Sequence, residues 1–184
     1  MSLYPQLTAF CARPVDHLGM KYNSDAYGRM EIRFPDPRQA LGAIRFRAFD
    51  GEAPIELRYR AMFMLEGDRG VVTSNQVSHP IFAPENTRAV QFLKAVQLSL
   101  GPSAQEFEIR YSGTVSYYMQ PIQTPYPSVG SGEWLGNTST GAEKAWLSQI
   151  YVTISRRSHD RGGEPPFVPP VPSDDGWEVP TQHP

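Results

Sequence analysis

With 184 residues, the chain is long enough for one domain of ordinary size and a tail, and its 40% hydrophobic and 11% aromatic content excludes disorder throughout. Its 17 Lys and Arg residues against 19 Asp and Glu residues give a net charge of −2, which argues against non-specific wrapping of nucleic acid. The single cysteine, Cys11, excludes an internal disulfide and a cysteine-based metal cage, and we expect a buried thiol there.

The N-terminal residues show no targeting pattern. No apolar run in the chain approaches the ~20 residues that a membrane-spanning helix needs. The segment MSLYPQLTAFCARP has no basic stretch followed by an apolar core. We therefore expect no membrane partner and no export through a signal peptide, and we assign residues 1–29 to an N-terminal extension.

Alternation of apolar and polar residues dominates the chain from Met30 to Ile154. Apolar residues two positions apart, separated by Glu or Arg, are typical of half-buried strands that place one face on a core. The pattern occurs in segments 30–34, 43–49, 55–65, 107–119 and 146–154. It predicts that the following side chains lie inside: Ile44, Phe46, Leu57, Tyr59, Phe63, Ile109, Tyr111, Ile150 and Val152.

Turn residues separate these segments. Asp50-Gly51 predicts a hairpin joining 43–49 to 55–65, and EGDRG at 66–70 predicts a turn into the VVT segment that follows. Gly101-Pro102 marks another reversal. Residues 87–100 fit both a helical stripe and a strand face, and we favour a strand entered through a helical turn.

Several short strands without intervening helices predict an all-β fold, an antiparallel β-sandwich of jelly-roll type. Arg and Glu on successive strands are expected to form cross-strand pairs that support the register. We divide the chain into a β-sandwich domain, residues 1–157 with the N-terminal extension included, and a Pro-rich C-terminal arm, residues 158–184.

A long connection is predicted between Met119 and Ala145, far longer than the ~4–6 residues typical of such loops. Long loops usually bind something, and we place this one at one end of the sandwich. Aromatic rings there can stack on sugars or on another subunit, or they can cap that end of the sandwich. The candidate contact residues are Tyr117, Tyr118, Tyr126 and Trp134.

No catalytic constellation stands out in the sequence. Ser158-His159-Asp160 contains the letters of a triad, but adjacent residues cannot converge on one reacting atom. The histidines, at 17, 79, 159 and 183, have no metal-ligand spacing. Asn137-Thr138-Ser139 matches the glycosylation pattern, which arises often by chance. We expect no enzymatic activity, no metal and no cofactor.

The C-terminal segment, residues 158–184, contains seven prolines. Proline fixes φ and donates no backbone hydrogen bond, so the segment favours extended conformations and builds no core of its own. We interpret it as an arm that lies on a neighbouring subunit or on its own domain; a PxxP ligand for an aromatic groove is the alternative. Its apolar anchors are Phe167, Val168, Val171 and Trp177.

A small basic cluster stands where the sandwich gives way to the arm. It consists of Arg156, Arg157 and Arg161. Such a cluster can meet a phosphate or an acidic neighbour. The simpler interpretation is a solvated strand end.

In layout, residues ~30–157 resemble a small viral jelly-roll protein. The residues that carry the resemblance are the alternating strands IRFRAF, IELRYRAMFML, FEIRYSGTVSYYM and LSQIYVTIS, together with the Pro-rich tail. The resemblance implies a structural subunit of a virion, assembled in the host cytoplasm: a capsid, minor-capsid or decoration protein. Its partners would be homo- or hetero-oligomeric neighbours in a large assembly. Because MSLYPQLTAF lacks a basic arm, direct genome packaging is not expected.

A different class of function fits the same strands. A β-sandwich ligand-binding module, specialised for carbohydrate binding or adhesion, would use the aromatic residues Tyr126 and Trp134 to contact a glycan and would be cytoplasmic. The oligomeric state distinguishes the two hypotheses. A defined large oligomer favours the structural subunit, and a monomer favours the module.

Overall fold

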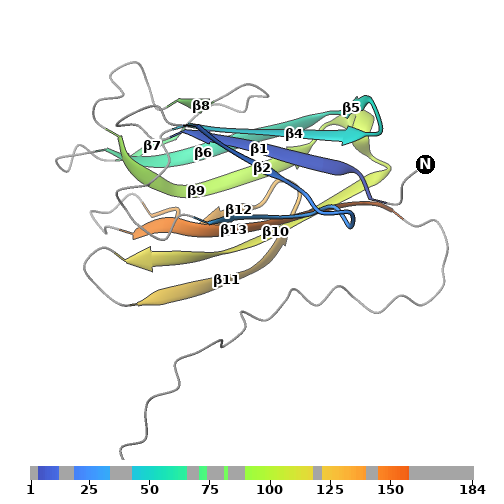
Figure 1. Cartoon of the computed structure of the whole chain (residues 1–184). Coiled ribbons are helices and arrows are strands. Elements are labelled where there is room, and N and C mark those ends of the chain that lie inside the picture. The colour runs from blue at the N-terminus through green and yellow to red at the C-terminus, as the bar shows by residue number, and fades with distance from the viewer. Residues whose placement is uncertain are drawn as a thin grey trace, which may run out of the picture.

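The structure, a computed structural model, describes residues 4–12, 19–33, 43–65, 71–73, 81–82, 90–117, 122–139 and 145–157. Within these ranges every regular element is an antiparallel strand, apart from one turn of 3₁₀ helix at Pro102–Ala104. The sheets pack together as a β-sandwich (Figure 1), so the predicted all-β class is confirmed. The predicted arm, residues 158–184, lies outside the described residues.

Sheet A contains, in spatial order, β2 (Gly19–Asn23), β1 (Gln6–Ala12), β4 (Ala43–Asp50) and β5 (Ala53–Ile55), and β8 (Ile81–Phe82) also pairs with β4. β4 and β5 form the hairpin predicted from Asp50-Gly51. Gly51 has a φ of 61°, a left-handed conformation that glycine adopts without steric cost. Strands β1 and β2 arise from the segment that we expected to be an N-terminal extension.

Sheet B contains β11 (Gln123–Gly130), β10 (Phe107–Tyr117), β13 (Ala145–Arg156) and β3 (Arg29–Arg33). Its predicted alternation is confirmed in β3, where Met30 and Ile32 are buried between exposed neighbours. In the pairing of β13 with β3, Ile150 lies opposite Ile32 and Val152 opposite Met30. The hydrophobic pattern therefore sets the register, because a slip of β3 by one residue would turn its two apolar side chains to the outer face.

Sheet C contains β12 (Trp134–Gly136), β9 (Val90–Leu100), β6 (Leu57–Leu65) and β7 (Val71–Thr73). The strand that we favoured for the ambiguous segment is confirmed as β9. The predicted return of β6 onto the VVT segment is confirmed by their pairing. At Gly136, where φ is 109°, an added Cβ would lie 2.4 Å from the backbone oxygen of Lys94, so glycine is required for β12 to approach β9.

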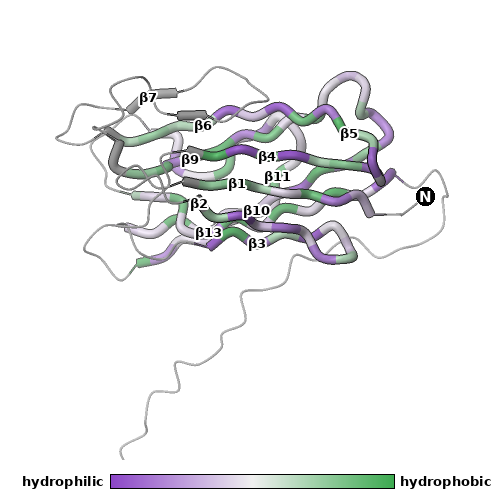
Figure 2. Tube along the Cα trace, turned by 45° about the horizontal axis from the view of Figure 1, so that its top comes forward, coloured by the Kyte–Doolittle hydropathy of each residue, from purple (hydrophilic) through white to green (hydrophobic). Residues whose placement is uncertain are grey.

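One hydrophobic core joins the three sheets. All of the predicted inward-facing side chains are buried in it: Ile44, Phe46, Leu57, Tyr59, Phe63, Ile109, Tyr111, Ile150 and Val152. Figure 2 shows hydrophobic and hydrophilic segments alternating along the strands. The ring of Tyr59 in sheet C meets that of Phe46 in sheet A edge-on, with 5.6 Å between centroids. Cys11 is fully buried, as expected.

The predicted long strand 55–65 is divided between two sheets. Ile55 ends β5 in sheet A, and Leu57 begins β6 in sheet C, with Glu56 between them. The described strands therefore pair into three sheets where we expected two, and the jelly-roll arrangement is not confirmed. The predicted cross-strand Arg and Glu pairs also differ, since Arg58 and Arg110 pair with Glu56 and Glu108 two residues earlier on the chain.

The predicted loop between Met119 and Ala145 is wrong, because most of its described part is strand. Residues 123–130 form β11, which pairs with β10 at the edge of sheet B, and residues 134–136 form β12 at the edge of sheet C. Pro125 and Pro127 suggested a loop. An edge strand tolerates proline, since one side of its backbone makes no ladder hydrogen bonds.

Candidate functional site

The aromatic residues predicted to contact a partner lie on three different elements. Tyr117 ends β10 and Tyr126 lies in β11; both are half-buried and pack against the core. Trp134 begins β12, and the Arg60 guanidinium lies 5.4 Å from the centre of its ring. These three rings thus belong to edge or end positions of the sheets rather than to one loop. Tyr118 lies outside the described residues.

Arg156 of the predicted basic cluster already has acidic partners. It forms ion pairs with Asp50 at the end of β4 and with Glu106 before β10, and its guanidinium lies 4.9 Å from the ring centre of Phe107. Arg157 is exposed, and its Nε donates to the backbone oxygen of Phe107. Arg156 therefore ties the end of sheet B to the end of sheet A, and its charge is neutralised there.

The remaining predicted site residues fall outside the described residues. They are Arg161 and the arm anchors Phe167, Val168, Val171 and Trp177, and the four histidines are outside as well. Among the residues that the structure describes, no cluster of His, Cys, Asp and Glu could hold a metal ion. Asn137 of the glycosylation triplet is buried, and its Oδ1 accepts a hydrogen bond from the Ser139 amide. The described part of the chain contains no helix with the length and apolar character that a membrane crossing requires.

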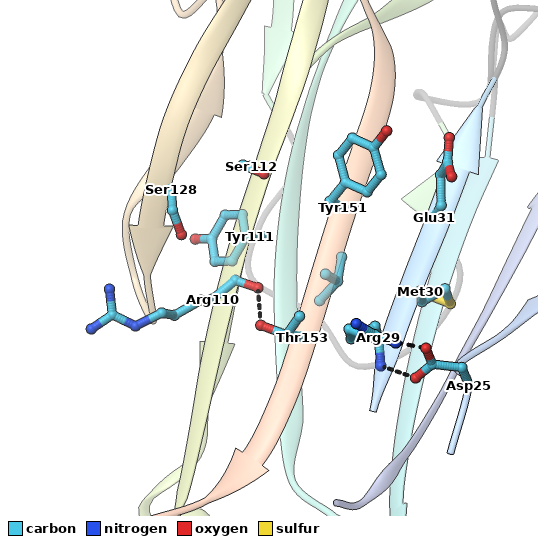
Figure 3. A pocket seen from close by; sticks show the side chains of 11 residues that line it. Asp25, Arg29, Met30, Glu31, Arg110, Tyr111, Ser112, Ser128, Tyr151 and Thr153 are labelled. Atoms are coloured by element: carbon cyan, nitrogen blue, oxygen red, sulfur yellow. Dashed lines mark hydrogen bonds and ion pairs between the residues drawn. The ribbon is translucent and has the colours of Figure 1, made fainter. Parts of the chain in front are cut away.

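A shallow groove of about 230 Å³ crosses the outer face of sheet B (Figure 3). Its floor is formed by neighbouring strands β3, β13 and β10, and β11 and the turn before β3 border it. Hydroxyl-bearing residues occupy the middle, and charged residues occupy both sides. The polar residues that line it are Asp25, Arg29, Glu31, Arg110, Ser112, Ser128, Tyr151 and Thr153.

One side of the groove is held by the turn that precedes β3. The Asp25 carboxylate accepts hydrogen bonds from the backbone amides of Tyr27 and Arg29 and from Arg29 Nε at 2.9 Å. Slight desolvation opposes ionisation, but these hydrogen bonds and the nearby guanidinium hold the pKa of Asp25 below its usual value. Asp25 is thus ionised at neutral pH, and it fixes Arg29 at the groove wall.

A second polar cluster lies on β3 and β13. Glu31 and Tyr151 are register partners, and Figure 3 shows their side chains together at one end of the groove. The Gln149 amide donates to Glu31 Oε1 at 2.8 Å and to the Tyr151 hydroxyl. Desolvation, and after it the negative charge of Glu31, raises the pKa of Tyr151. The Tyr151 hydroxyl is therefore neutral and can both donate and accept a hydrogen bond, and its own aromatic ring is available for stacking.

This arrangement can bind a polar ligand. A ring, several hydroxyl groups, a carboxylate and a guanidinium on a rigid sheet can satisfy a ligand that is rich in hydroxyl groups. The sequence alternation did place Glu31, Arg110 and other outward residues on an open face. It did not show that β3, β13 and β10 are neighbours, so we did not predict the groove.

Comparisons with known proteins give no relative. The chain matches no protein-family model, and neither a curated protein nor a solved structure is significantly similar to it.

Proposed function

We propose that the protein is a structural subunit of a large assembly, of the kind found in virions as capsid, minor-capsid or decoration proteins. The observation that supports this proposal is that each sheet presents an arginine beside an accessible aromatic ring. Aromatic residues and arginine are enriched in protein–protein interfaces, where most of the binding energy comes from a few such anchors. A shell subunit needs contacts on several sides. The three pairs are Phe10 with Arg45 in sheet A, Tyr27 with Arg29 at sheet B, and Trp134 with Arg60 in sheet C.

The three pairs differ in exposure. Tyr27, in the turn before β3, is 59% exposed, and Phe10 in β1 is 40% exposed. Trp134 is half-buried. The guanidinium carbons lie 5.0 to 5.7 Å from the ring centres, within the range of a cation–π contact. A neighbour that covers such a pair would bury a flat apolar ring and keep the arginine available for a directed hydrogen bond.

Mass measurement of the purified full-length protein tests the proposal. We expect a defined large oligomer in light scattering after size-exclusion chromatography, with a regular particle in electron microscopy. Deletion of residues 162–184 should leave the circular dichroism of the β-sandwich unchanged and weaken the assembly. Deletion of residues 179–184 alone is the matched control, because it keeps all four arm anchors. A full-length protein that stays monomeric at every concentration would overturn the proposal.

A ligand-binding module is the second candidate function, and the groove on sheet B favours it. Its hydroxyl groups and charges can bond the hydroxyl groups of a glycan, and the Tyr151 ring can stack on a sugar ring. Titration of the protein with a panel of mono- and oligosaccharides tests this candidate. Binding that is lost in Tyr151→Ala and kept in Tyr126→Ala would support the groove. Binding that is lost in Tyr126→Ala instead would support the aromatic residues proposed from the sequence.

A further inference from the structure

The outer face of sheet A carries three cations around an exposed ring. In β1, Leu7, Ala9 and Cys11 point into the core, so Thr8 and Phe10 point outwards. Phe10 lies directly opposite Lys21 of β2 on one side and opposite Arg45 of β4 on the other. Adjacent strands are ~4.8 Å apart, so this row spans ~10 Å. We call Lys21, Phe10, Arg45 and Arg47 the basic face.

Arg47 belongs to the next row of the same surface. It is exposed and lies opposite Thr8, which in turn lies opposite Asn23 of β2. Arg45 and Arg47 are two residues apart on β4, with the buried Phe46 between them on the inner side. The two guanidinium groups therefore project from the same side of one strand, and a single extended segment could contact both.

Lys21, Arg45 and Arg47 form no ion pair with another described residue. On sheet B, in contrast, Arg29 pairs with Asp25 and Arg110 with Glu108. Like charges on one strand repel each other, so an anionic group that covers the basic face lowers its electrostatic free energy. An exposed aromatic ring at the centre of such a face also favours a partner that contributes an apolar side chain.

The chain itself contains a segment of the complementary chemistry. Residues 158–184 hold five acidic residues and one arginine, a net charge of −4 with neutral histidines. Since the whole chain carries −2, residues 1–157 carry +2. Three of its acidic residues surround a tryptophan in the segment Asp174-Asp175-Gly176-Trp177-Glu178. This segment is complementary in charge to the basic face, where cations surround the ring of Phe10.

We propose that residues 174–178 of one subunit dock on the basic face of a neighbouring copy. In an extended segment Asp175 and Trp177 lie on the same side, so the Asp175 carboxylate pairs with Arg45 and Arg47 while Trp177 covers Phe10. The planar guanidinium groups donate hydrogen bonds to the carboxylate, and Asp174 adds negative charge beside it. This inference rests on the proposed function, since it names the partner surface of the arm in the assembly. The described aromatic and charged residues of sheet A supply the receiving side.

The position of the arm's root favours a neighbour over the same chain. The ion pair of Arg156 with Asp50 places the end of β13 beside the end of β4. Arg47 and Arg45 lie three and five residues back along β4, which is ~10–17 Å away. The segment PPFVPPVP at 165–172 spans ~25 Å in the extended conformation that proline favours. With the arm extended, residues 174–178 would overshoot their own basic face unless residues 158–164 doubled back.

Charge reversal in the full-length protein tests the proposal. The first variant is Arg45→Glu/Arg47→Glu, and the second is Asp174→Arg/Asp175→Arg. Each variant alone should raise the protein concentration needed for assembly at least ~tenfold, because like charges then face each other. An equimolar mixture of the two should assemble again, because each acidic face then meets a basic arm. Circular dichroism and thermal melting verify that both variants are folded.

The control variant is Arg33→Glu/Arg58→Glu, which reverses the same number of exposed charges on sheets B and C and should assemble as the wild type does. Unchanged assembly of both test variants would overturn the docking surface while the proposed function stands. Assembly restored by combining all four substitutions in one chain, but not by mixing, would show that the arm covers its own face. A wild-type protein that never assembles would instead contradict the proposed function.

Discussion

The outer faces of sheets A and B are both rich in arginine, but they differ in whether these arginines have carboxylate partners. On sheet B, Arg29 and Arg110 have carboxylate partners within the same face, and Glu31 is bonded by Gln149. On sheet A, Arg45 and Arg47 stand near an exposed ring without such partners among the described residues. The comparison teaches that Arg29 and Arg110 of one face are paired within it, whereas Arg45 and Arg47 of the other face have no carboxylate partner among the described residues.

The largest effect should come from comparing a buried and an exposed phenylalanine of sheet A, Phe46 and Phe10. Phe46 is 1% exposed and packs on Tyr59, whereas Phe10 is 40% exposed on the opposite side of the sheet. Phe46→Ala should lower the free energy of unfolding by roughly 3–5 kcal/mol, since it leaves a cavity. Phe10→Ala should change it by no more than about 1 kcal/mol. Denaturant unfolding monitored by circular dichroism measures both.

Phe10→Leu is the control for the shape of the exposed side chain, and it should unfold as the wild type does. Equal losses in Phe46→Ala and Phe10→Ala would mean that the basic face is part of the folding core. It would then not be a docking surface.

Tyr111, on the inner side of sheet B, and Tyr151, on its outer side, give the next comparison. The Tyr111 hydroxyl accepts from the Leu98 amide and donates to the Glu133 backbone oxygen, so it links sheet B to sheet C. Tyr111→Phe should cost about 1–3 kcal/mol of unfolding free energy, because buried backbone groups lose their partner. Tyr151→Phe, in the groove, should cost less than about 0.5 kcal/mol. Urea denaturation distinguishes them, and a larger loss for Tyr151→Phe would contradict this assignment.

The stability at alkaline pH should report on two buried groups, Cys11 on the inner side of sheet A and Tyr111 on the inner side of sheet B. Burial raises the pKa of Cys11, beneath sheet A, from 9.0 to about 12, and that of Tyr111, beneath sheet B, from 10.0 to about 12. The unfolded chain ionises first, so the stability is fully present below pH 9 and is lost as the pH rises towards 12. The free energy of unfolding should therefore fall above pH 9, measured by denaturant titration at several pH values.

The matched variants separate the two groups. Cys11→Ala should reduce the loss of stability that begins near pH 9, and Tyr111→Phe should reduce the loss that begins near pH 10. A pH dependence identical to that of the wild type in both variants would show that other groups control alkaline unfolding.

Local periodicity predicted the inward residues correctly but not the partners of each strand. The apolar alternation runs unbroken from Ile55 to Phe63, yet the chain passes from sheet A to sheet C at Glu56. Which strands pair depends on contacts between residues distant in sequence, and a pattern of period two carries no record of them. The groove was missed for the same reason, because its lining requires β3, β13 and β10 to be neighbours.

Composition misled the prediction where polar or proline residues occupy strands. Ser148 interrupts the apolar pattern of β13, but it is buried because its hydroxyl bonds that of Ser116 at 2.7 Å. Pro125 and Pro127 made β11 resemble a loop, although it is an edge strand. The lesson is physical: a polar side chain is tolerated inside when it is paired, and proline is tolerated in a strand whose outer side is free.

The smallest effects test the comparison of the two faces most directly, because they should differ in sign. Asp25→Asn removes a carboxylate that bonds Arg29 and two backbone amides, so it should lower the free energy of unfolding by up to about 1 kcal/mol. Arg47→Gln removes a cation without an ion-pair partner in the described residues and relieves its repulsion with Arg45. It should leave the stability of the dissociated subunit unchanged or raise it by a few tenths of a kcal/mol.

Salt provides the control for both variants, since the Debye length falls to ~3 Å at 1 M and exposed charge interactions are screened. Both differences from the wild type should shrink at 1 M NaCl in thermal or urea unfolding; for Asp25→Asn, a part that reflects hydrogen bonds to backbone amides should persist. Destabilisation by Arg47→Gln as large as that by Asp25→Asn would mean that Arg47 has a stabilising partner within its own subunit. Arg47 would then be paired like Arg29 and Arg110 of sheet B, and the charge argument for a docking arm would fail.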